Sequence, residues 1–308
     1  MKHKLRRIIS LASVLTVGGC ALGMFAGCTT KHPEVTITYT FDGKNYSVRY
    51  VLSRNDAPKT VQHFIELADA GFYDGLCIHN YTGDAMYSGG YKLVNGELEE
   101  VDYWTTVKQL EEEKNIKFTQ SVWMNDDDKT PLYTVYGEFE ANAVYTQYSR
   151  ENRHAKGALV MYYPQTTAEG KSDIDVLVER ADGGKNNEGQ TIDSKKYSTN
   201  CATSLFYTFT GYSSSGLDYS YCVFGMADED DYEKNLEKGL FAAIAEYEST
   251  LTQDEEDEDS KSFTEKITGV KLNQYDPFDQ VRKAAIDTTY QTPKDKPIII
   301  KSIKVNKY

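Results

Sequence analysis

The sequence of 308 residues lacks the short motifs that mark the commonest enzyme sites. It has no G-x-S-x-G nucleophile turn, no H-E-x-x-H zinc helix, no G-x-x-x-x-G-K phosphate loop and no dinucleotide fingerprint after a strand-like run. It also has no repeat with a period of about 20–50 residues, which excludes a solenoid. Because these motifs are absent, the sequence gives no sign of a hydrolase or of a nucleotide-binding enzyme.

Cysteine and positive charge are both scarce. The five cysteines form no C-x-x-C pair and have no histidine at metal-ligand spacing, so we expect no metal site and no cofactor. A disulfide between Cys201 and Cys222 is permitted outside the cell, although buried thiols at Cys77, Cys201 and Cys222 are the simpler interpretation. The 34 basic residues are outnumbered by 47 acidic ones, and the net charge of −13 repels phosphate backbones. Nucleic acid is therefore excluded as an expected partner.

The composition is that of a folded globular chain. Hydrophobic residues make up 40% and charged residues 26%, which excludes wholesale disorder and a protein with many membrane spans. The length suits one large domain or two small ones, with enough chain to bury a sizeable core.

The first 27 residues have the pattern of an export signal. Residues 1–7 are basic, residues 8–25 are apolar or small, and Phe25-Ala26-Gly27-Cys28 follows. This ending resembles the lipobox of bacterial lipoproteins, which implies a signal peptide over 1–27, a lipid anchor on Cys28 and a short tether over 28–34. The chain is then expected on the extracytoplasmic face of the cell membrane, held close to the bilayer by its acyl chains. Cys20 is a second candidate for the anchor, and an uncleaved membrane-spanning helix is the alternative to cleavage.

Strand-like alternation dominates the rest of the chain. Residues 35–41 alternate apolar and polar side chains, residues 42–45 supply a turn, and residues 46–52 resume the alternation, which predicts a β-hairpin. Pro58 begins a stretch with apolar residues at helical spacing, which predicts a helix of about thirteen residues. Further strand-like runs lie near 76–81, 85–91, 133–139, 157–163, 203–210, 220–224 and 298–305.

Two polar stretches interrupt this pattern. Residues 92–132 are charged and partly helical, and residues 165–198 are rich in Gly, Asn, Asp and Thr, so both are interpreted as loop insertions. A further amphipathic helix is predicted over 229–251. The acidic run over 254–259 is interpreted as a solvated loop, because it lacks the glycine and the ligand spacing of a calcium loop.

Eight short segments, in their order along the chain, carry a family resemblance. They are Asp56-Ala-Pro-Lys-Thr-Val-Gln-His-Phe64, Gly71-Phe-Tyr-Asp-Gly75, Ile78-His79-Asn80, Met86-Tyr-Ser-Gly89-Gly90, Tyr136-Gly-Glu-Phe139, Gly157-Ala-Leu-Val-Met161, Ala202-Thr-Ser-Leu-Phe206-Tyr207, and Leu217-Asp218 before Val223-Phe224-Gly225. Together they resemble the cyclophilin family of peptidyl-prolyl isomerases. The resemblance implies one mainly β domain over 35–308, a closed eight-stranded antiparallel barrel capped by helices, with insertions at 92–132 and 165–198.

The resemblance also implies the chemistry. Rotation about an X–Pro amide breaks no bond, but its barrier is about 18–20 kcal/mol because conjugation is lost. A donor aimed at the prolyl nitrogen lowers this barrier, and cyclophilins use an arginine directly after a strand histidine for that purpose. In this sequence the position holds Asn80, a shorter and neutral donor. Asn80 is therefore the candidate catalytic residue, and weak isomerase activity is expected.

The peptide-binding positions can be carried over in the same way. The residues that match the family's groove are His79, Ala85, Met86, Ser88, Leu205, Phe206, Tyr207, Leu217 and Tyr221. Several depart from the family, since Ala85 replaces an aromatic ring and Ser88 and Leu205 replace glutamines. Each of these residues also has a plain structural interpretation, because a strand histidine and the apolar members suit the core of any β barrel.

These observations predict a peptidyl-prolyl isomerase-like protein that acts on exported, proline-containing polypeptides at the cell surface. The alternative is a non-catalytic peptide-binding or chaperone module on the same scaffold, which the substitutions at 80, 85 and 205 favour. A third hypothesis places the function on the two insertions, with the barrel as a platform.

Overall fold

The structure is a computed structural model. It describes residues 32–142, 152–162, 175–180, 183–187, 189–196, 201–212, 216–251, 262–271 and 287–308. The leader, Cys28 and the acidic run at 254–259 lie outside these residues, so the predictions made for them remain predictions. Within the described residues, no helix is both long enough and apolar enough to span a bilayer.

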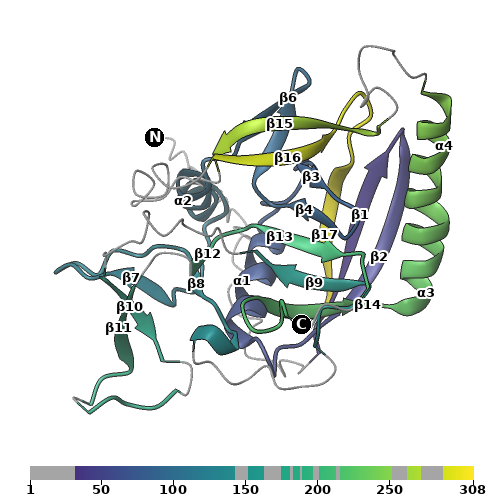
Figure 1. Ribbon diagram of the computed structural model, residues 1–308. Coiled ribbons are helices and arrows are strands. Elements are labelled where there is room, and N and C mark those ends of the chain that lie inside the picture. The colour runs from purple at the N-terminus through teal and green to yellow at the C-terminus, as the bar shows by residue number, and fades with distance from the viewer. Residues whose placement is uncertain are drawn as a thin grey trace, which may run out of the picture.

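One antiparallel sheet of eight strands forms the body of the molecule (Figure 1). Its strand order is β17 (Ile299–Lys307), β1 (Glu34–Phe41), β2 (Lys44–Leu52), β14 (Cys222–Ala227), β9 (Ala158–Met161), β13 (Phe206–Phe209), β4 (Ala85–Ser88) and β3 (Asn80–Tyr81). The hairpin predicted over 35–52 is confirmed as β1 and β2, which pair from Glu34 opposite Val51 to Phe41 opposite Lys44. Alternate residues of β1 are buried, as the sequence pattern predicts.

The expected closed barrel is wrong, because the sheet is open and forms a half-barrel. Its edge strands β3 and β17 form no ladder with each other, since β3 contains only two residues. The segment before β3 meets β17 through a bridge between Cys77 and Ile299 and through three backbone hydrogen bonds. These run from the Gly75 N–H to the Ile300 carbonyl (2.8 Å), from the Ile300 N–H to the Leu76 carbonyl (2.8 Å) and from the Ile78 N–H to the Ile298 carbonyl (2.9 Å). The expectation of eight antiparallel strands with few helices holds.

Two helices cover the sheet. Helix α1 (Pro58–Asp69) begins at the predicted proline and packs Phe64 against Phe206 and Phe224 on the inner face. The second helix is continuous in the chain and runs beside β2 (Figure 1); it consists of α3 (Glu229–Asp231), a π-helical stretch η5 (Tyr232–Phe241) and α4 (Ala242–Thr250). The predicted helix over 229–251 is thus confirmed, with an unpredicted change of helical type inside it.

Strands from both insertions, β7 (Val122–Met124), β10 (Asp175–Glu179) and β11 (Ile192–Lys196), form one small sheet at the side of the body (Figure 1), whereas β5 (Tyr91–Val94) and β6 (Glu97–Glu100) form a separate hairpin. The first insertion supplies β5, β6, helix α2 (Tyr103–Lys114) and β7, and the second supplies β10 and β11. Strand β7 pairs with β10, and β10 pairs with β11. In their described residues, both stretches therefore contain strands, and the first also contains a helix.

The remaining elements are short and lie around the body. They are β8 (Val135–Tyr136), which pairs with β12 (Cys201–Ala202), the 3-10 turn η2 (Glu140–Asn142), and the hairpin of β15 (Thr264–Lys271) and β16 (Asp287–Pro293). The sequence pattern did not predict this last hairpin. Cys77, Cys201 and Cys222 are buried thiols, and the Cys222 thiol donates to the Thr60 hydroxyl oxygen at 3.6 Å.

Candidate functional site

The sheet register assigns the candidate residues to two opposite faces. Asn80 on β3 lies opposite Tyr87 on β4, Tyr87 lies opposite Tyr207 on β13, and Tyr207 lies opposite Val160 on β9, which in turn lies opposite Val223 on β14. Cross-strand partners in an antiparallel sheet present their side chains on the same face. These residues therefore form one row across five strands on the outer face of the sheet, with Asn80 at its end.

A second row runs parallel to the first on the same face. Ala85 lies opposite Phe209, and Ala158 lies opposite Met226; the Gly157 N–H donates to the Phe209 carbonyl at 2.9 Å and so connects the two pairs. Ala85, Tyr207, Phe209, Ala158, Val160 and Val223 are all buried in one apolar cluster on this face. Of the sequence-predicted residues, the structure thus brings together Ala85, Tyr207, Leu217 and Tyr221.

The other predicted residues lie elsewhere. Met86 and Phe206 face the inner core, and the buried Ser88 hydroxyl donates to the Cys77 carbonyl at 2.8 Å. Leu205 is buried just before β13, where its carbonyl accepts from the Tyr162 N–H at 2.9 Å. Residues one apart along a strand point to opposite faces, so no single surface can present all of the predicted groove residues.

Tyrosine rings cover the outer-face cluster. Tyr87, Tyr162, Leu217 and Tyr221 are half-buried and pack on it, with ring centroids 4.9 Å apart for Tyr87 and Tyr207 and 5.5 Å apart for Tyr87 and Tyr162. Tyr162 and Tyr221 lie nearly parallel, with an interplanar angle of 13° and a centroid distance of 6.4 Å. Tyr87 and Tyr162 are not among the predicted groove residues, although Ala158, Val160 and Tyr162 alternate along the chain and so share this face.

The side chains of Asp218, His154 and Tyr207 are linked by hydrogen bonds beside this cluster. The His154 Nδ1 atom lies 2.7 Å from Asp218 Oδ1, and His154 Nε2 lies 2.7 Å from the Tyr207 hydroxyl. Burial lowers the pKa of His154 and Asp218 opposes that shift, while burial raises the pKa of Tyr207. With His154 neutral, Nδ1–H donates to Asp218, and Nε2 accepts from the Tyr207 hydroxyl.

The hairpin of β15 and β16 lies against β3, next to Asn80 (Figure 1). The Gln291 backbone N–H donates to Asn80 Oδ1 at 2.9 Å, and the Thr292 hydroxyl donates to the His79 carbonyl at 2.8 Å. Because Oδ1 accepts this bond, the amide NH₂ is the part of Asn80 that can donate to a ligand.

His79 itself is a core residue. It is 2% exposed, and its ring lies between Tyr91 and Tyr290 with centroid distances of 4.6 and 4.9 Å. Burial lowers the pKa of His79 to about 3, so the ring is neutral at ordinary pH. Among the described residues, no three His, Cys, Asp or Glu side chains are arranged to hold a metal ion.

Comparison with known proteins gives a consistent result. The family described as "Cyclophilin type peptidyl-prolyl cis-trans isomerase/CLD" matches residues 36–232. A "Peptidyl-prolyl cis-trans isomerase" of Synechococcus elongatus is 43% identical over 44 residues, which span 14% of this chain and only 30% of that relative.

Solved structures give more distant similarities. Two crystal structures of a Cryptosporidium parvum cyclophilin type peptidyl-prolyl cis-trans isomerase, one in the presence of the dipeptide Ala-Pro, are each 14% identical to this chain. They cover 90% and 89% of this chain and 99% of their own, with TM-scores of 0.39 and 0.38.

Proposed function

Because the chain belongs to the cyclophilin-type peptidyl-prolyl cis-trans isomerase family, we propose that it binds proline-containing segments of exported polypeptides and isomerises them weakly. The observation that carries this proposal is the half-buried aromatic surface of Tyr87, Tyr162 and Tyr221 with Asn80 at its edge. Proline-rich segments bind to aromatic-lined surfaces elsewhere, since the proline ring packs well on flat rings. The outer face of this sheet therefore has the chemistry to hold a prolyl residue beside the Asn80 amide.

Weak catalysis follows from the donor. A hydrogen bond from a neutral group contributes about 0.5–1.5 kcal/mol, against about 1.5–3 kcal/mol from a charged one. Loss of a transition-state donor typically costs about 10²–10³ in rate. The carboxamide of Asn80 is also bonded through its oxygen to Gln291, which limits its movement toward a substrate.

The test measures, by NMR, the rate of cis–trans exchange in a peptide with one proline. We expect micromolar wild-type protein to increase the rate of cis–trans exchange slightly. Asn80→Arg restores a charged donor and should increase this rate by a further factor of up to about 10². Asn80→Ala is the matched control and should fall below the wild type. If Asn80→Arg and the wild type are both inactive while the peptide still binds, the catalytic part of the proposal is wrong.

That last outcome supports the second candidate function, a non-catalytic peptide-binding or chaperone module. The bond from the Gln291 N–H to Asn80 favours it, because it engages the candidate catalytic side chain within the protein itself. Delay of aggregation of an unfolded, proline-containing client, equal for wild type and Asn80→Ala, would identify this activity.

We also propose that the protein acts at the cell surface, held by a lipid on Cys28. Only the sequence pattern of residues 1–28 supports this. Labelling of cells with a radioactive fatty acid should mark the wild type and not Cys28→Ala, and the variant should leave the membrane fraction. Equal labelling of both, or membrane retention of an unlabelled variant, contradicts the anchor.

A further inference from the structure

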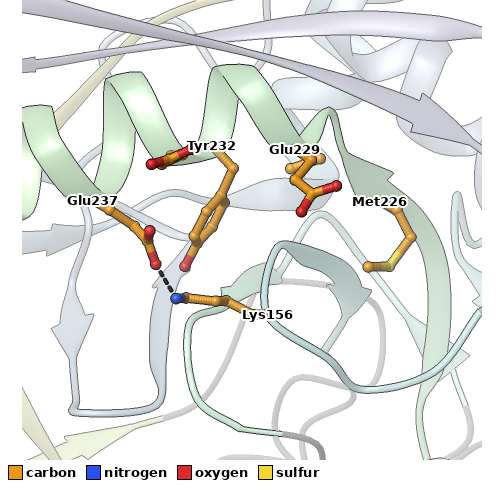
Figure 2. Close-up of a pocket in the computed structure, with 7 residues that line it drawn as sticks. Lys156, Met226, Glu229, Tyr232 and Glu237 are labelled. Carbon is orange, nitrogen blue, oxygen red and sulfur yellow. Dashed lines mark ion pairs between the residues drawn. The ribbon is translucent and has the colours of Figure 1, made fainter.

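A pocket opens at the end of the outer face, away from Asn80. It has a volume of about 430 Å³ and lies between the loop before β9 and the start of the second helix (Figure 2). Its lining residues are Lys156, Met226, Ala227, Glu229, Tyr232, Glu233 and Glu237. Met226 also packs on the outer-face cluster, so the pocket adjoins the proposed peptide-binding surface.

Carboxylates dominate the charge of this pocket. Glu229, Glu233 and Glu237 recur every four residues and lie on one side of the helix that lines it, against one basic residue, Lys156. Lys156 forms an ion pair with Glu237, and its ammonium lies 5.8 Å from the centre of the Tyr232 ring. The pocket thus already holds one ammonium group against a carboxylate and an aromatic face. Glu233 forms an ion pair with Lys238 of the same helix, so the exposed Glu229 is the remaining carboxylate of the lining.

Tyr232 gives an independent sign of a missing ligand. The residue is 6% exposed, yet its hydroxyl is buried without a hydrogen-bond partner among the described residues. In Figure 2 this hydroxyl points from the helix toward Lys156, into the pocket. Buried hydroxyls normally have a partner, because an unsatisfied one costs about 1–3 kcal/mol. Tyr232 also begins the π-helical stretch, a conformation that is frequent at functional sites.

The ligand chemistry follows from these groups. Since no described trio of carboxylates is arranged for a metal ion, an organic cation fits better than a divalent metal. Met226 and the Tyr232 ring suit the aliphatic part of a long side chain, and the glutamates suit its charge. Lysine or arginine in a polypeptide has both properties.

The spacing from the proline surface can be estimated. Tyr87, the ring of the proline surface that lies opposite Asn80, is on β4, and Met226 is on β14, three strand spacings across the sheet in the order β4, β13, β9, β14. At about 4.8 Å per spacing this is about 14 Å, or about four residues of an extended peptide. We propose that this pocket binds a lysine or arginine side chain about four residues from the proline of a polypeptide bound on the outer face, an inference that rests on the proposed function for its substrate.

The test compares two fluorescent peptides by polarisation at low salt. Both peptides contain one proline, and one carries lysine and the other norleucine four residues from it. Each pair is made twice, with this residue before the proline and with it after the proline. We expect the lysine peptide to bind about two- to fivefold more tightly, as one exposed carboxylate allows. Glu229→Gln with Glu233→Gln should remove this preference, whereas the matched control Glu97→Gln with Glu99→Gln, exposed on β6, should retain it.

Two further measurements separate the outcomes. Tyr232→Phe deletes only the hydroxyl that lacks a partner, so it should fold normally and reduce the preference for lysine. Equal binding of both peptides to the wild type overturns the basic-residue pocket and leaves the proposed function intact. If neither peptide binds, N-acetyl-lysine amide is titrated alone: saturable NMR shifts that are lost in the double glutamine variant support the pocket while the proposed function fails, and no shift overturns both.

Discussion

At the scale of single residues, the proposed isomerase function depends on two side chains of the outer face. At position 80 a neutral amide stands where the family resemblance implies a charged donor, and at position 207 a tyrosine stands where it implies a plain aromatic ring. The added hydroxyl of Tyr207 is bonded to His154, which is bonded to Asp218. These two hydrogen bonds hold the buried Tyr207 ring, on which the half-buried rings of the aromatic surface pack.

Tyr207→Phe should therefore destabilise the protein. It leaves His154 Nε2 buried without a donor, which costs about 1–3 kcal/mol. Urea unfolding at pH 7 measures the change in the free energy of unfolding. Tyr87→Phe is the control, since Tyr87 is half-buried on the same face; an equal loss in both variants would mean that the bond to His154 contributes nothing.

At the scale of elements, helix α1 depends on a residue far away in sequence. Its N-cap position, Ala57, offers no side-chain acceptor. Instead, the buried Glu138 accepts from the Lys59 N–H at 3.1 Å and from the Thr60 N–H at 2.8 Å. A carboxylate at a helix N-terminus also meets the positive end of the helix dipole. Glu138 thus caps α1 from the segment Tyr136-Gly-Glu-Phe139.

Glu138→Gln should lower the free energy of unfolding by about 1–2 kcal/mol, because the amide keeps one acceptor and loses the charge. Differential scanning calorimetry should show a lower Tm for this variant. The control is Glu140→Gln, two residues on and exposed, which should leave the Tm unchanged. The capping role is wrong if the two variants melt together.

At the scale of the whole molecule, buried histidines set the response to acid. Burial lowers the pKa of His63 to about 4 and that of His79 to about 3, from 6.5. The folded state therefore disfavours their protonation, so stability is fully present above about pH 6.5 and is lost as the pH falls through the folded pKa values. At about 1.4 kcal/mol per pKa unit, each histidine lowers the free energy of unfolding by roughly 3 kcal/mol or more once the pH is below its folded-state pKa.

His79→Phe should flatten this acid dependence. The phenyl ring fits between Tyr91 and Tyr290 and removes the buried Nδ1 atom, which has no hydrogen-bond partner among the described residues. Urea unfolding from pH 7 to pH 4.5 should give a steeper loss for the wild type than for the variant, with similar values at pH 7. Parallel curves would show that His79 does not contribute to the acid response.

Local pattern was a sufficient guide to much of this molecule. The alternation over 35–52 set the hairpin, and Pro58 set the start of α1. Positions 85 and 87 on β4 share one face, as do 207 and 209 on β13, because side chains alternate along a strand. The double glycine is explained by close packing, since a Cβ on Gly89 would lie 2.1 Å from the Ser204 carbonyl oxygen. The candidate donor position, Asn80, was also evident from motif order.

What the amino-acid sequence determined by itself was the β1–β2 hairpin, most other strands of the main sheet, the two helices that cover it and the residue types at the candidate site, because these follow from interactions between near neighbours in the chain. Only the tertiary structure decided that the sheet stays open, that β7 pairs with β10, that Gln291 bonds Asn80 and that tyrosines cover the outer face. Those outcomes join segments separated by many tens of residues. Their energies depend on packing between surfaces that exist only after each element has formed, so no local periodicity reports them.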